Sequence, residues 1–340
     1  MNSLSPGGLQ EHTDNIVVYF QGSSALENKI DKRVVVHNLN YTGLASLPGV
    51  LLKLRRLIKQ HGTDIIHSHL NPAGWYAHLV CPDTAVQVHT LHTTYSMDTV
   101  TPASKLYFEK QLYFKKQNCN IILLSDFIER DFLKSIPFAG KHFVLNNFVE
   151  DAFFKTTSKE YEHSNKQLRM VAAGRLTALK NFEYLLQVFA HLKGREICLD
   201  IYGGGDVTKY EKQISEMGIN VKMMGHHEHL AEVISSYDLF IMPSKFEGFP
   251  LSLFEAMAAG VPLMLSDIAP LRSIVKEHAI YFTLDDEKAV AAILESVLDK
   301  QTDINELARN ALVFANKTVR RETYITKLLE IYNQILIPRL

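Results

Sequence analysis

The chain has 340 residues, of which 36 are Lys or Arg and 37 are Asp or Glu. This length fits two domains of ordinary size, and the balanced charge provides no field that favours nucleic acid as a partner. The three cysteines, Cys81, Cys119 and Cys198, are isolated, as is usual in a reducing compartment. No apolar run approaches the ~18 residues of a membrane helix, and the N-terminus has no signal-peptide core. These features predict a cytoplasmic protein.

Short apolar or β-branched runs recur along the chain, at residues 15–20, 33–39, 64–69, 85–91, 119–125, 142–147, 169–174, 197–203, 221–225, 238–244 and 261–266. Segments with helical periodicity, such as 47–60, 181–192 and 230–237, separate most of these runs. This alternation is typical of parallel sheets with crossover helices. It predicts an α/β protein with two doubly wound domains.

The boundary between the two domains is predicted in the polar stretch 150–167, which lacks apolar periodicity. We place the first domain at residues 1–150 and the second at 151–322, and we expect a C-terminal helix of about residues 323–340 to pack back on the first. In such sheets ligands bind beyond the carboxyl ends of strands, so residues at strand ends are the functional candidates.

Two features of the first domain are candidates for ligand contact. The run 64–69 carries His67 and His69 two residues apart, so both lie on one face of a strand, and His92 follows the next strand. A lone histidine at a strand end is more often a hydrogen-bonded core residue. The segment 104–117, which interleaves lysines with aromatic residues, predicts a helix that packs on its own sheet, which we favour, or one that lies on a membrane surface.

In the second domain, glycines and cations follow two strands. Gly174 and Arg175 end one strand and Lys180 begins the next helix, an arrangement that can hold a diphosphate, although such a loop alone is more often a solvated surface. The strand at 197–203 runs into G-G-G-D, where backbone can approach a ligand, a weak signal by itself. The histidine-rich loop 225–230 lacks a matched second half, so we expect no metal there.

The most informative stretch is S-K-F-E-G-F-P-L-S-L-F-E-A-M-A-A-G-V-P, residues 244–262. Pro250 suits the first position of a short helix, which the sequence A-G-V-P ends. The unpaired first-turn N–H groups around residues 249–252 form an anion site, with Glu247 ahead of it and Glu255 beside it. Two carboxylates that flank a phosphate site suit a ligand with hydroxyls at both ends, such as a nucleotide sugar.

In this order and spacing, A-A-G-R-x4-K-N, the strand-ending G-G-G and P-S-x-x-E-G-F-P-L-S-L-F-E-A-M-A-A-G-V-P resemble the retaining glycosyltransferases of family 4. The resemblance covers residues 169 to about 335 well and 51–149 moderately. It implies the GT-B fold, in which two Rossmann-like domains face a cleft. It also implies transfer of a sugar from a nucleotide diphosphate sugar to a hydroxyl acceptor, with retained anomeric configuration.

The resemblance also implies roles for individual residues. Arg175 and Lys180 match the residues that contact the donor diphosphate, Glu247 matches the glutamate that faces the sugar hydroxyls, and Glu255 matches the one that binds the ribose. His69 matches a histidine near the donor sugar and the acceptor; with Arg175, Lys180 and Glu247 it makes up the predicted catalytic set. The remaining residues predicted to bind the donor are Gly8, Gly174, Gly203, Gly204, Gly248, Phe249, Leu251 and Ser252.

Several further expectations concern cofactors and partners. His92 stands where the family often has an acceptor-side histidine. The chain has no D-x-D motif, which favours metal-independent catalysis without a cofactor, and no separate carboxylate nucleophile is evident, unlike in retaining hydrolases. The departing phosphate can then take the acceptor proton. Relatives that build lipid-linked glycans touch membranes through the first domain, so peripheral contact with the inner face of the cell membrane stays open.

The N-terminus departs from the family pattern, because S-P-G-G-L-Q, with Gly7 and Gly8, precedes the strand at 15–20 almost directly. The first domain is therefore expected to be shortened, without its first strand and helix. Loss of a central strand leaves a gap in the core or requires another element to fill it. The same departure puts the role of Gly8 in doubt.

The function that we favour is transfer from a UDP-sugar to a glycan or lipid-linked acceptor in bacterial polysaccharide or glycolipid synthesis. One alternative is an inactive nucleotide-sugar-binding partner with a degraded acceptor lobe. Another is a GT-B sugar-nucleotide epimerase, against which the family-4 helix motif argues. The sequence determines neither the donor base, the sugar, the acceptor nor the linkage, because folds fix reaction types better than substrates.

Overall fold

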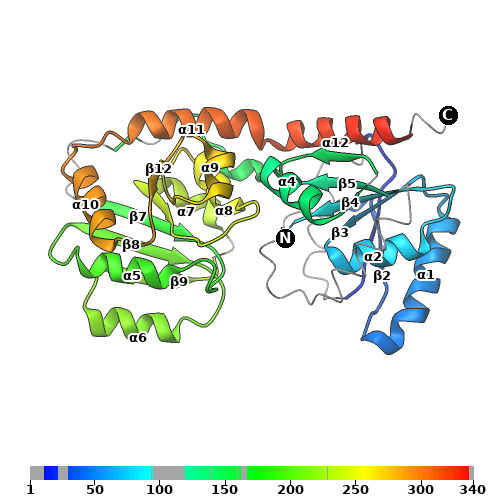
Figure 1. Ribbon diagram of the computed structural model, residues 1–340, viewed down its shortest axis with the longest axis horizontal. Coiled ribbons are helices and arrows are strands. Elements are labelled where there is room, and N and C mark those ends of the chain that lie inside the picture. The colour runs from blue at the N-terminus through cyan, green and yellow to red at the C-terminus, as the bar shows by residue number, and fades with distance from the viewer. Residues whose placement is uncertain are drawn as a thin grey trace. The chain divides into compact units, whose positions relative to one another are not determined.

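The computed structural model describes residues 11–21, 30–92, 94, 119–138, 140–158, 160–161, 167–227 and 229–336. The chain divides into two compact units: Met1–Asn146 together with Arg321–Leu340, and Asn147–Arg320. Each unit contains parallel strands with helices between them (Figure 1), so the predicted α/β class is confirmed.

The boundary between the units lies between Asn146 and Asn147, ahead of the predicted linker at residues 150–167. Within that stretch Phe153 and Tyr161 are each 7% exposed and pack into the cores of the second unit. These two buried aromatic side chains explain why the chain joins the second unit before the position expected from its polar composition.

The first unit contains a four-stranded parallel sheet in the order β3-β4-β5-β6. Its elements are β3 (Ile65–His69), α2 (Asn71–Val80), β4 (Val86–Leu91), β5 (Cys119–Leu123), α4 (Asp126–Ser135) and β6 (His142–Val144). Every residue of β4 and β5 is buried, as expected for strands of a parallel sheet that is covered on both faces. Ser125 starts α4, because its Oγ accepts a hydrogen bond from the Ile128 N–H.

A second parallel sheet in this unit pairs β1 (Ile16–Tyr19) with β2 (Val35–Asn38). Among the described residues no strand joins β1 to β3, so the strands of this unit form two separate sheets. Helix α1 (Leu47–Gln60) shares one apolar cluster with Val18 of β1 and Ile66 of β3. Side chains of α1 thus form a core with both sheets. The expected loss of the first strand stays a prediction, because residues 1–10 lie outside the described residues.

The C-terminal helix α12 (Arg321–Leu336) belongs to the first unit. Its buried residues are Tyr324, Ile325, Leu328, Ile331 and Ile335. The ammonium of Lys141 donates a hydrogen bond to the Gln334 carbonyl at 2.9 Å, which ties the end of α12 to the start of β6.

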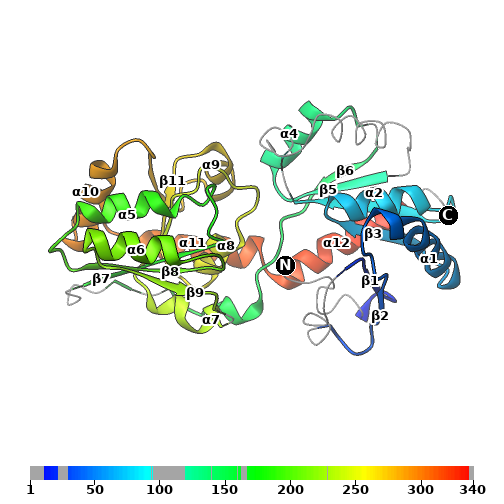
Figure 2. The ribbon, with the colours of Figure 1, turned by 90° about the horizontal axis from the view of Figure 1, so that it is seen from below.

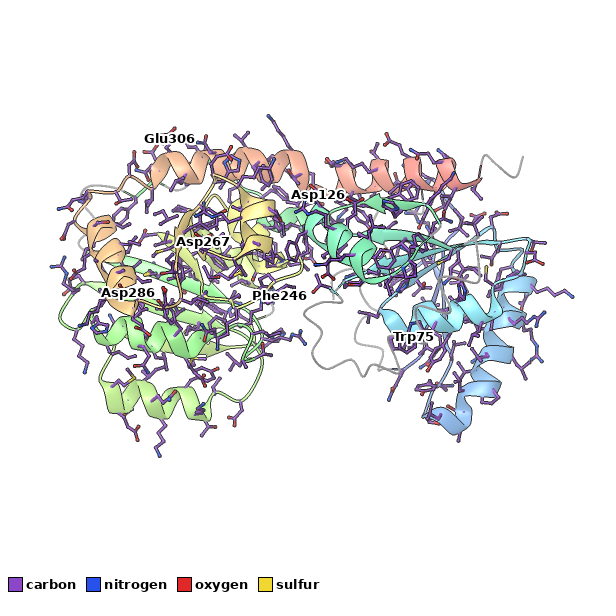
Figure 3. All side chains as sticks on the ribbon, viewed as in Figure 1. Trp75, Asp126, Phe246, Asp267, Asp286 and Glu306 are labelled. Carbon is purple, nitrogen blue, oxygen red and sulfur yellow. The ribbon has the colours of Figure 1, made fainter. Side chains whose placement is uncertain are left out.

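The second unit is a six-stranded parallel sheet in the order β12-β11-β10-β7-β8-β9. Its strands are β7 (Leu168–Ala173), β8 (Ile197–Tyr202), β9 (Val221–Gly225), β10 (Leu239–Met242), β11 (Leu263–Ser266) and β12 (Ile280–Phe282). Its helices are α5 (Phe182–Ala190), α6 (Thr208–Met217), α7 (Leu230–Val233), α8 (Leu251–Ala258), α9 (Ala269–Val275), α10 (Glu287–Leu298) and α11 (Asn305–Thr318). Helices α5 and α6 lie side by side next to the sheet (Figure 2). Asp286 starts α10 (Figure 3), where its carboxylate accepts from the Ala289 N–H at 2.9 Å.

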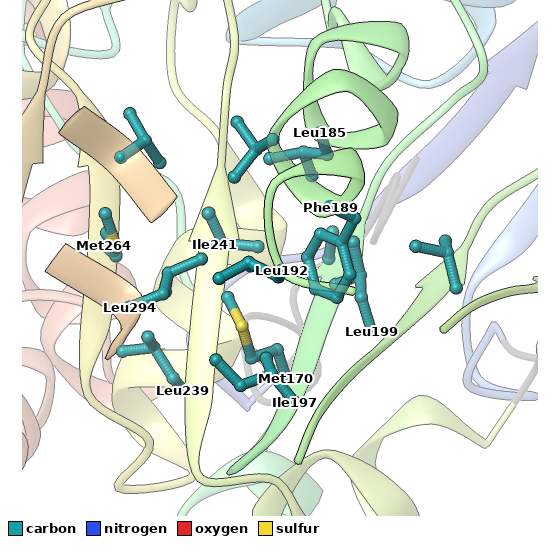
Figure 4. Packing of buried hydrophobic residues seen from close by; sticks show 14 of the residues in the cluster. Met170, Leu185, Phe189, Leu192, Ile197, Leu199, Leu239, Ile241, Met264 and Leu294 are labelled. Carbon is teal, nitrogen blue, oxygen red and sulfur yellow. The ribbon is translucent and has the colours of Figure 1, made fainter. Parts of the chain in front are cut away.

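Apolar cores cover both faces of this sheet. On one face, Met170 and Leu199 of the strands pack with Leu185 and Phe189 of α5, and all four are at most 2% exposed (Figure 4). On the other face, the fully buried Phe254 brings α8 into the second core. Because both faces are buried, the ends of the strands are firmly held, and so are the starting points of the loops that follow them.

Three details differ from the sequence predictions. The predicted helix at 230–237 is the short α7 followed by a 3-10 turn, Ile234–Ser236. Strand β12 was not predicted, because its three residues give too short a pattern. Helix α8 begins at Leu251, with Pro250 as its N-cap instead of its first residue. The segment 104–117 lies outside the described residues. No helix in the described part of the chain is long and apolar enough to cross a membrane.

Candidate functional site

The order of strands in the second unit reverses at β7. Strand β8 lies on one side of β7 and β10 on the other, so the loops that follow β7 and β10 leave the same edge of the sheet next to each other. Such a reversal creates the crevice in which doubly wound sheets bind ligands. The predicted residues Gly174, Arg175 and Lys180 lie in the first of these loops, and Glu247 and Gly248 lie in the second.

The loops after β7 and β8 pack backbone against backbone. The Gly174 N–H donates to the Tyr202 carbonyl at 2.9 Å, and the Leu176 N–H donates to the Gly204 carbonyl at 3.0 Å. A Cβ on Gly203 would overlap the carbonyl oxygen of Gly174, whereas a Cβ on Gly204 would meet nothing within 4 Å. Gly203 therefore permits the contact between the loops, while Gly204 leaves its backbone open to a ligand.

The loop after β7 is also fastened to the loop after β10. The Lys245 N–H donates to the Leu179 carbonyl at 2.8 Å, and the Asn181 side chain donates to the Pro243 carbonyl at 3.2 Å. The Ser252 hydroxyl, in the first turn of α8, donates to the Ala173 carbonyl at the end of β7 at 2.8 Å. These bonds hold the start of α8 beside the cationic loop.

One ion pair joins the loop after β7 to the loop after β10. The Lys180 ammonium and the Ser244 hydroxyl donate to the same oxygen of Glu247, Oε1, at 2.5 and 2.6 Å. Glu247 is 7% exposed and Ser244 fully buried, and the Ser266 hydroxyl donates to the Ser244 carbonyl at 2.6 Å. No hydrogen bond from the described residues reaches Oε2 of Glu247. One carboxylate oxygen is therefore fixed, and the other is left to accept from a ligand hydroxyl.

Two further groups can bind an anion. Arg175 is exposed and forms no ion pair with a described residue. The N-terminus of α8 has no side-chain cap, and the preceding Phe249 stacks on Phe254 with ring centroids 4.5 Å apart. The predicted Leu251 and Ser252 are the first two residues of this helix, where N–H groups lack intrahelical partners and carry the positive end of the dipole.

Glu255 lies one turn further along α8 and is partly buried. Burial, and secondly the negative charge of Glu150, raise the pKa of its carboxyl to about 7. A carboxyl with this pKa is protonated in about half of the molecules at neutral pH. Its protonation state therefore responds to any ligand that prefers one form.

The predicted histidines of the first unit form a stacked pair. The rings of His67 and His69 lie face to face, with centroids 4.5 Å apart and planes at 23°, as expected for two residues on one face of β3. His69 Nδ1 lies 3.3 Å from Nε2 of His92, so the two imidazoles share one hydrogen. Burial, and secondly the charge of His92, lower the pKa of His69 to about 4, and the pKa of His92 is lowered by burial. Both rings are therefore neutral near pH 7.

His67 is held by two hydroxyl groups. Its Nδ1 lies 2.6 Å from the Tyr332 hydroxyl of α12, and its Nε2 lies 2.7 Å from the Thr90 hydroxyl of β4. Burial, and secondly the charge of His69, lower the pKa of His67 well below its usual value. His67 is a neutral, fully hydrogen-bonded ring beneath His69.

The histidine-rich loop after β9 shows a different arrangement. The His227 ring meets the Tyr202 ring edge to face at 5.5 Å, and His229 lies 3.4 Å from the Glu232 carboxylate. In the part of the chain that the structure describes, no group of three or more His, Cys, Asp or Glu side chains could hold a metal ion. The predicted Gly8 lies outside the described residues.

Sequence reasoning missed four residues that support these groups. Ser244 stands three residues before Glu247, a spacing that could have suggested their bond, whereas Ser266 and Thr90 come from separate strands. Tyr332 lies 265 residues from His67, and no sequence pattern connects the two.

Comparisons with known proteins agree with the fold. The family model described as Glycosyltransferase Family 4 matches residues 8–153, and the model described as Glycosyl transferases group 1 matches residues 153–313. The chain is 23% identical over 312 residues to the UDP-Gal:alpha-D-GlcNAc-diphosphoundecaprenol alpha-1,3-galactosyltransferase of Escherichia coli, which covers 85% of this chain and 80% of that protein.

A second relative is the O-antigen biosynthesis glycosyltransferase WbnH of Escherichia coli, 25% identical over 296 residues and covering 82% of each chain. Among solved structures, Anabaena Alr3699/HepE in complex with UDP superposes with a TM-score of 0.79 at 17% identity, over 98% of each chain. This likeness confirms the expected GT-B fold class.

Proposed function

Because the chain belongs to the glycosyltransferases of family 4, we propose that it transfers a sugar from a UDP-sugar to a hydroxyl acceptor with retention of configuration. The observation that carries this proposal is the strand reversal between β7 and β10, where the largely buried Lys180–Glu247 ion pair and the uncapped start of α8 lie in adjacent loops. The diphosphate would bind at the N–H groups of Leu251 and Ser252. Arg175 and Lys180 would neutralise its charge.

The two ends of the donor would bind on either side of this anion site. Oε2 of Glu247 would accept from a hydroxyl of the donor sugar, because Lys180 and Ser244 already donate to Oε1. Glu255 would accept from the ribose hydroxyls. Carboxylates are strong acceptors for paired hydroxyls, so these two residues would select a ligand with a sugar at each end.

The chemistry of such a site is stabilisation of a leaving group. The bond between the anomeric carbon and the β-phosphate oxygen breaks, and the negative charge that develops on the phosphate is met by Arg175, Lys180 and the α8 N–H groups. The acceptor oxygen forms the new bond on the same face of the sugar, and its proton passes to the departing phosphate. We assign contact with the acceptor side of the sugar to His69. The protein groups named here would meet the phosphate charge without a metal.

The choice of UDP and of a glycan acceptor is supported by similar proteins. The name of the Escherichia coli galactosyltransferase gives UDP-Gal as donor and a diphosphoundecaprenol-linked sugar as acceptor, and HepE is described in complex with UDP. WbnH is described as an O-antigen biosynthesis enzyme. We therefore propose a role in bacterial polysaccharide or O-antigen synthesis.

Calorimetric titration of the protein with UDP, GDP and ADP in the presence of EDTA tests the donor site. Binding of UDP alone supports the proposal, and binding of none would contradict it. Incubation with UDP-sugars, with and without a lipid-diphosphate-linked sugar, then tests catalysis. Consumption of the donor only when the acceptor is present supports transfer. Binding of the donor without any turnover would indicate a nonenzymatic partner. Conversion of the donor without an acceptor would indicate an epimerase.

We also propose that the first unit contacts an anionic lipid surface through α1. Arg55, Arg56 and Lys59 are exposed on this helix and form no ion pair with a described residue, and Leu52 among them is 67% exposed. The sequence has no acidic residue between Asp31 and Asp64. Unpaired cations around an exposed leucine match the charge and the apolar layer of an anionic bilayer, where a lipid-linked acceptor would reside.

A further inference from the structure

The strongest feature outside the donor site is the hydrogen-bonded ring of His67. Its two nitrogens contact hydroxyls from two different elements, Tyr332 of α12 at 2.6 Å and Thr90 of β4 at 2.7 Å. The Tyr332 ring also meets the imidazole edge to face, at 5.8 Å and 82°. Because both nitrogens are occupied, His67 has no atom left with which to bind a substrate.

What His67 does contact is the ring of His69. The two imidazoles stack at 4.5 Å, and the far edge of His69 is held by its 3.3 Å contact with His92. One face and one edge of His69 are therefore fixed, while no described residue is hydrogen-bonded to its Nε2. The orientation of that nitrogen depends on the plane of the ring beneath it.

The plane of His67 depends in turn on its two hydroxyl partners. A neutral imidazole has one N–H donor and one bare acceptor nitrogen, so one hydroxyl donates to the ring and the other accepts from it. The two hydroxyls together fix the rotation of the ring, whichever tautomer is present. If either is removed, a buried nitrogen is left unpaired, and the ring is expected to turn toward another partner.

We propose that Tyr332 and Thr90 are positioning residues, which fix the plane of the His67 ring and through it the plane of His69. This inference rests on the proposed transferase function, in which His69 contacts the acceptor side of the sugar. It gives α12, at the far end of the chain, a defined part in catalysis. Small displacements of a contact group reduce the rate of a step that requires a single geometry.

The test compares four variants in the full-length protein. Tyr332→Phe and Thr90→Val remove a hydroxyl with little change of shape, and each should lower kcat by about tenfold or more, while the donor KM and the UDP affinity stay unchanged. Thr90→Ser keeps the hydroxyl and should recover most of the activity. Tyr281→Phe, which removes a hydroxyl that donates to the Lys276 carbonyl in the second unit, should act like the wild type.

A second measurement keeps the inference falsifiable without turnover. In protein labelled with ¹⁵N-histidine, Tyr332→Phe should shift the ring nitrogen resonances of both His67 and His69, and Tyr281→Phe should shift neither. An unchanged His69 signal, or wild-type kcat in Tyr332→Phe, would overturn the inference and leave the proposed function intact. If the wild-type protein binds no UDP and turns over no donor, the proposed function is wrong instead. The ring nitrogen resonances would still decide whether Tyr332 positions His69.

Discussion

Glu255→Gln should make the free protein more stable and at the same time weaken its binding of UDP. Burial and the charge of Glu150 raise the pKa of this carboxyl from 4.5 to about 7. That difference corresponds to about 3 kcal/mol of free energy between the two protonation states. The folded protein thus holds the proton more tightly than the unfolded chain. Its stability therefore falls as pH rises from about 4.5 to 7 and stays lower above that.

Glutamine has nearly the same shape and cannot ionise, so the variant avoids this loss. At pH 8 we expect Glu255→Gln to unfold in urea with a free energy up to about 3 kcal/mol above that of the wild type. At pH 4 the wild-type carboxyl is itself protonated, and the two proteins should have similar stability. A variant that is less stable than the wild type at pH 8 would contradict the cause assigned to the raised pKa.

UDP binding should show the opposite trend. Only the ionised carboxylate offers acceptors to both ribose hydroxyls, and its population rises from about a tenth at pH 6 to about nine tenths at pH 8, so affinity should rise about tenfold. The terminal phosphate of UDP also titrates in this range. The measured quantity is therefore the ratio of wild-type to Glu255→Gln affinity at each pH, from calorimetry. A ratio that stays constant between pH 6 and pH 8 would exclude Glu255 as the ribose ligand.

Three further predictions concern the donor loops and α1. Gly203→Ala should lower the free energy of unfolding by about 1–3 kcal/mol, because its Cβ overlaps a backbone carbonyl, whereas Gly204→Ala, with open space around it, should unfold like the wild type. Lys180→Met should destabilise the protein by about 3 kcal/mol, because it leaves the buried Glu247 carboxylate without its cation, whereas Arg175→Met, at an exposed residue, should cost no more than about 0.5 kcal/mol. Both variants should weaken UDP binding. Equal melting temperatures of the two variants would refute the structural role of the ion pair. Arg56→Glu should reduce sedimentation with anionic vesicles at about 0.15 M salt. Equal sedimentation of the variant and the wild type would argue against an electrostatic contact. Equal binding of the wild type to anionic and to pure phosphatidylcholine vesicles would argue against it too.

Much of the fold was predictable because its signals are local. The apolar spacing at residues 47–60 gave the bounds that α1 has, Leu47–Gln60, and the runs of the second half matched β7 to β11 to within one or two residues. Strand β12 has three residues, too few for a period of two to be recognised. The predicted boundary at residues 150–167 rests on polar composition, which does not reveal that Phe153 and Tyr161 are buried. The two compact units are divided between Asn146 and Asn147.

The candidate site was predictable as a set of residues but not as a set of contacts. The motifs named Lys180 and Glu247 for separate roles, and the structure pairs them through one oxygen and adds Ser244 to it. The raised pKa of Glu255 depends on burial and on Glu150, which no spacing in the sequence connects with it. Contacts of this kind arise from the packing of loops, which sequence periodicity does not encode.

Helix α12 contacts a strand that lies at an edge of its sheet in the described part of the first unit. Within the described residues β3 pairs with β4 on one side only, so the strand that carries His67 and His69 lies at an edge of its sheet. An edge strand lacks one of the two neighbours that normally fix its side chains. The carboxyl end of β3 is held in addition by side chains, through Thr90 of its paired neighbour β4 and Tyr332 of α12. The hydrogen bond of Tyr332 to His67 therefore lets α12 steady a strand that, among the described residues, pairs on one side only.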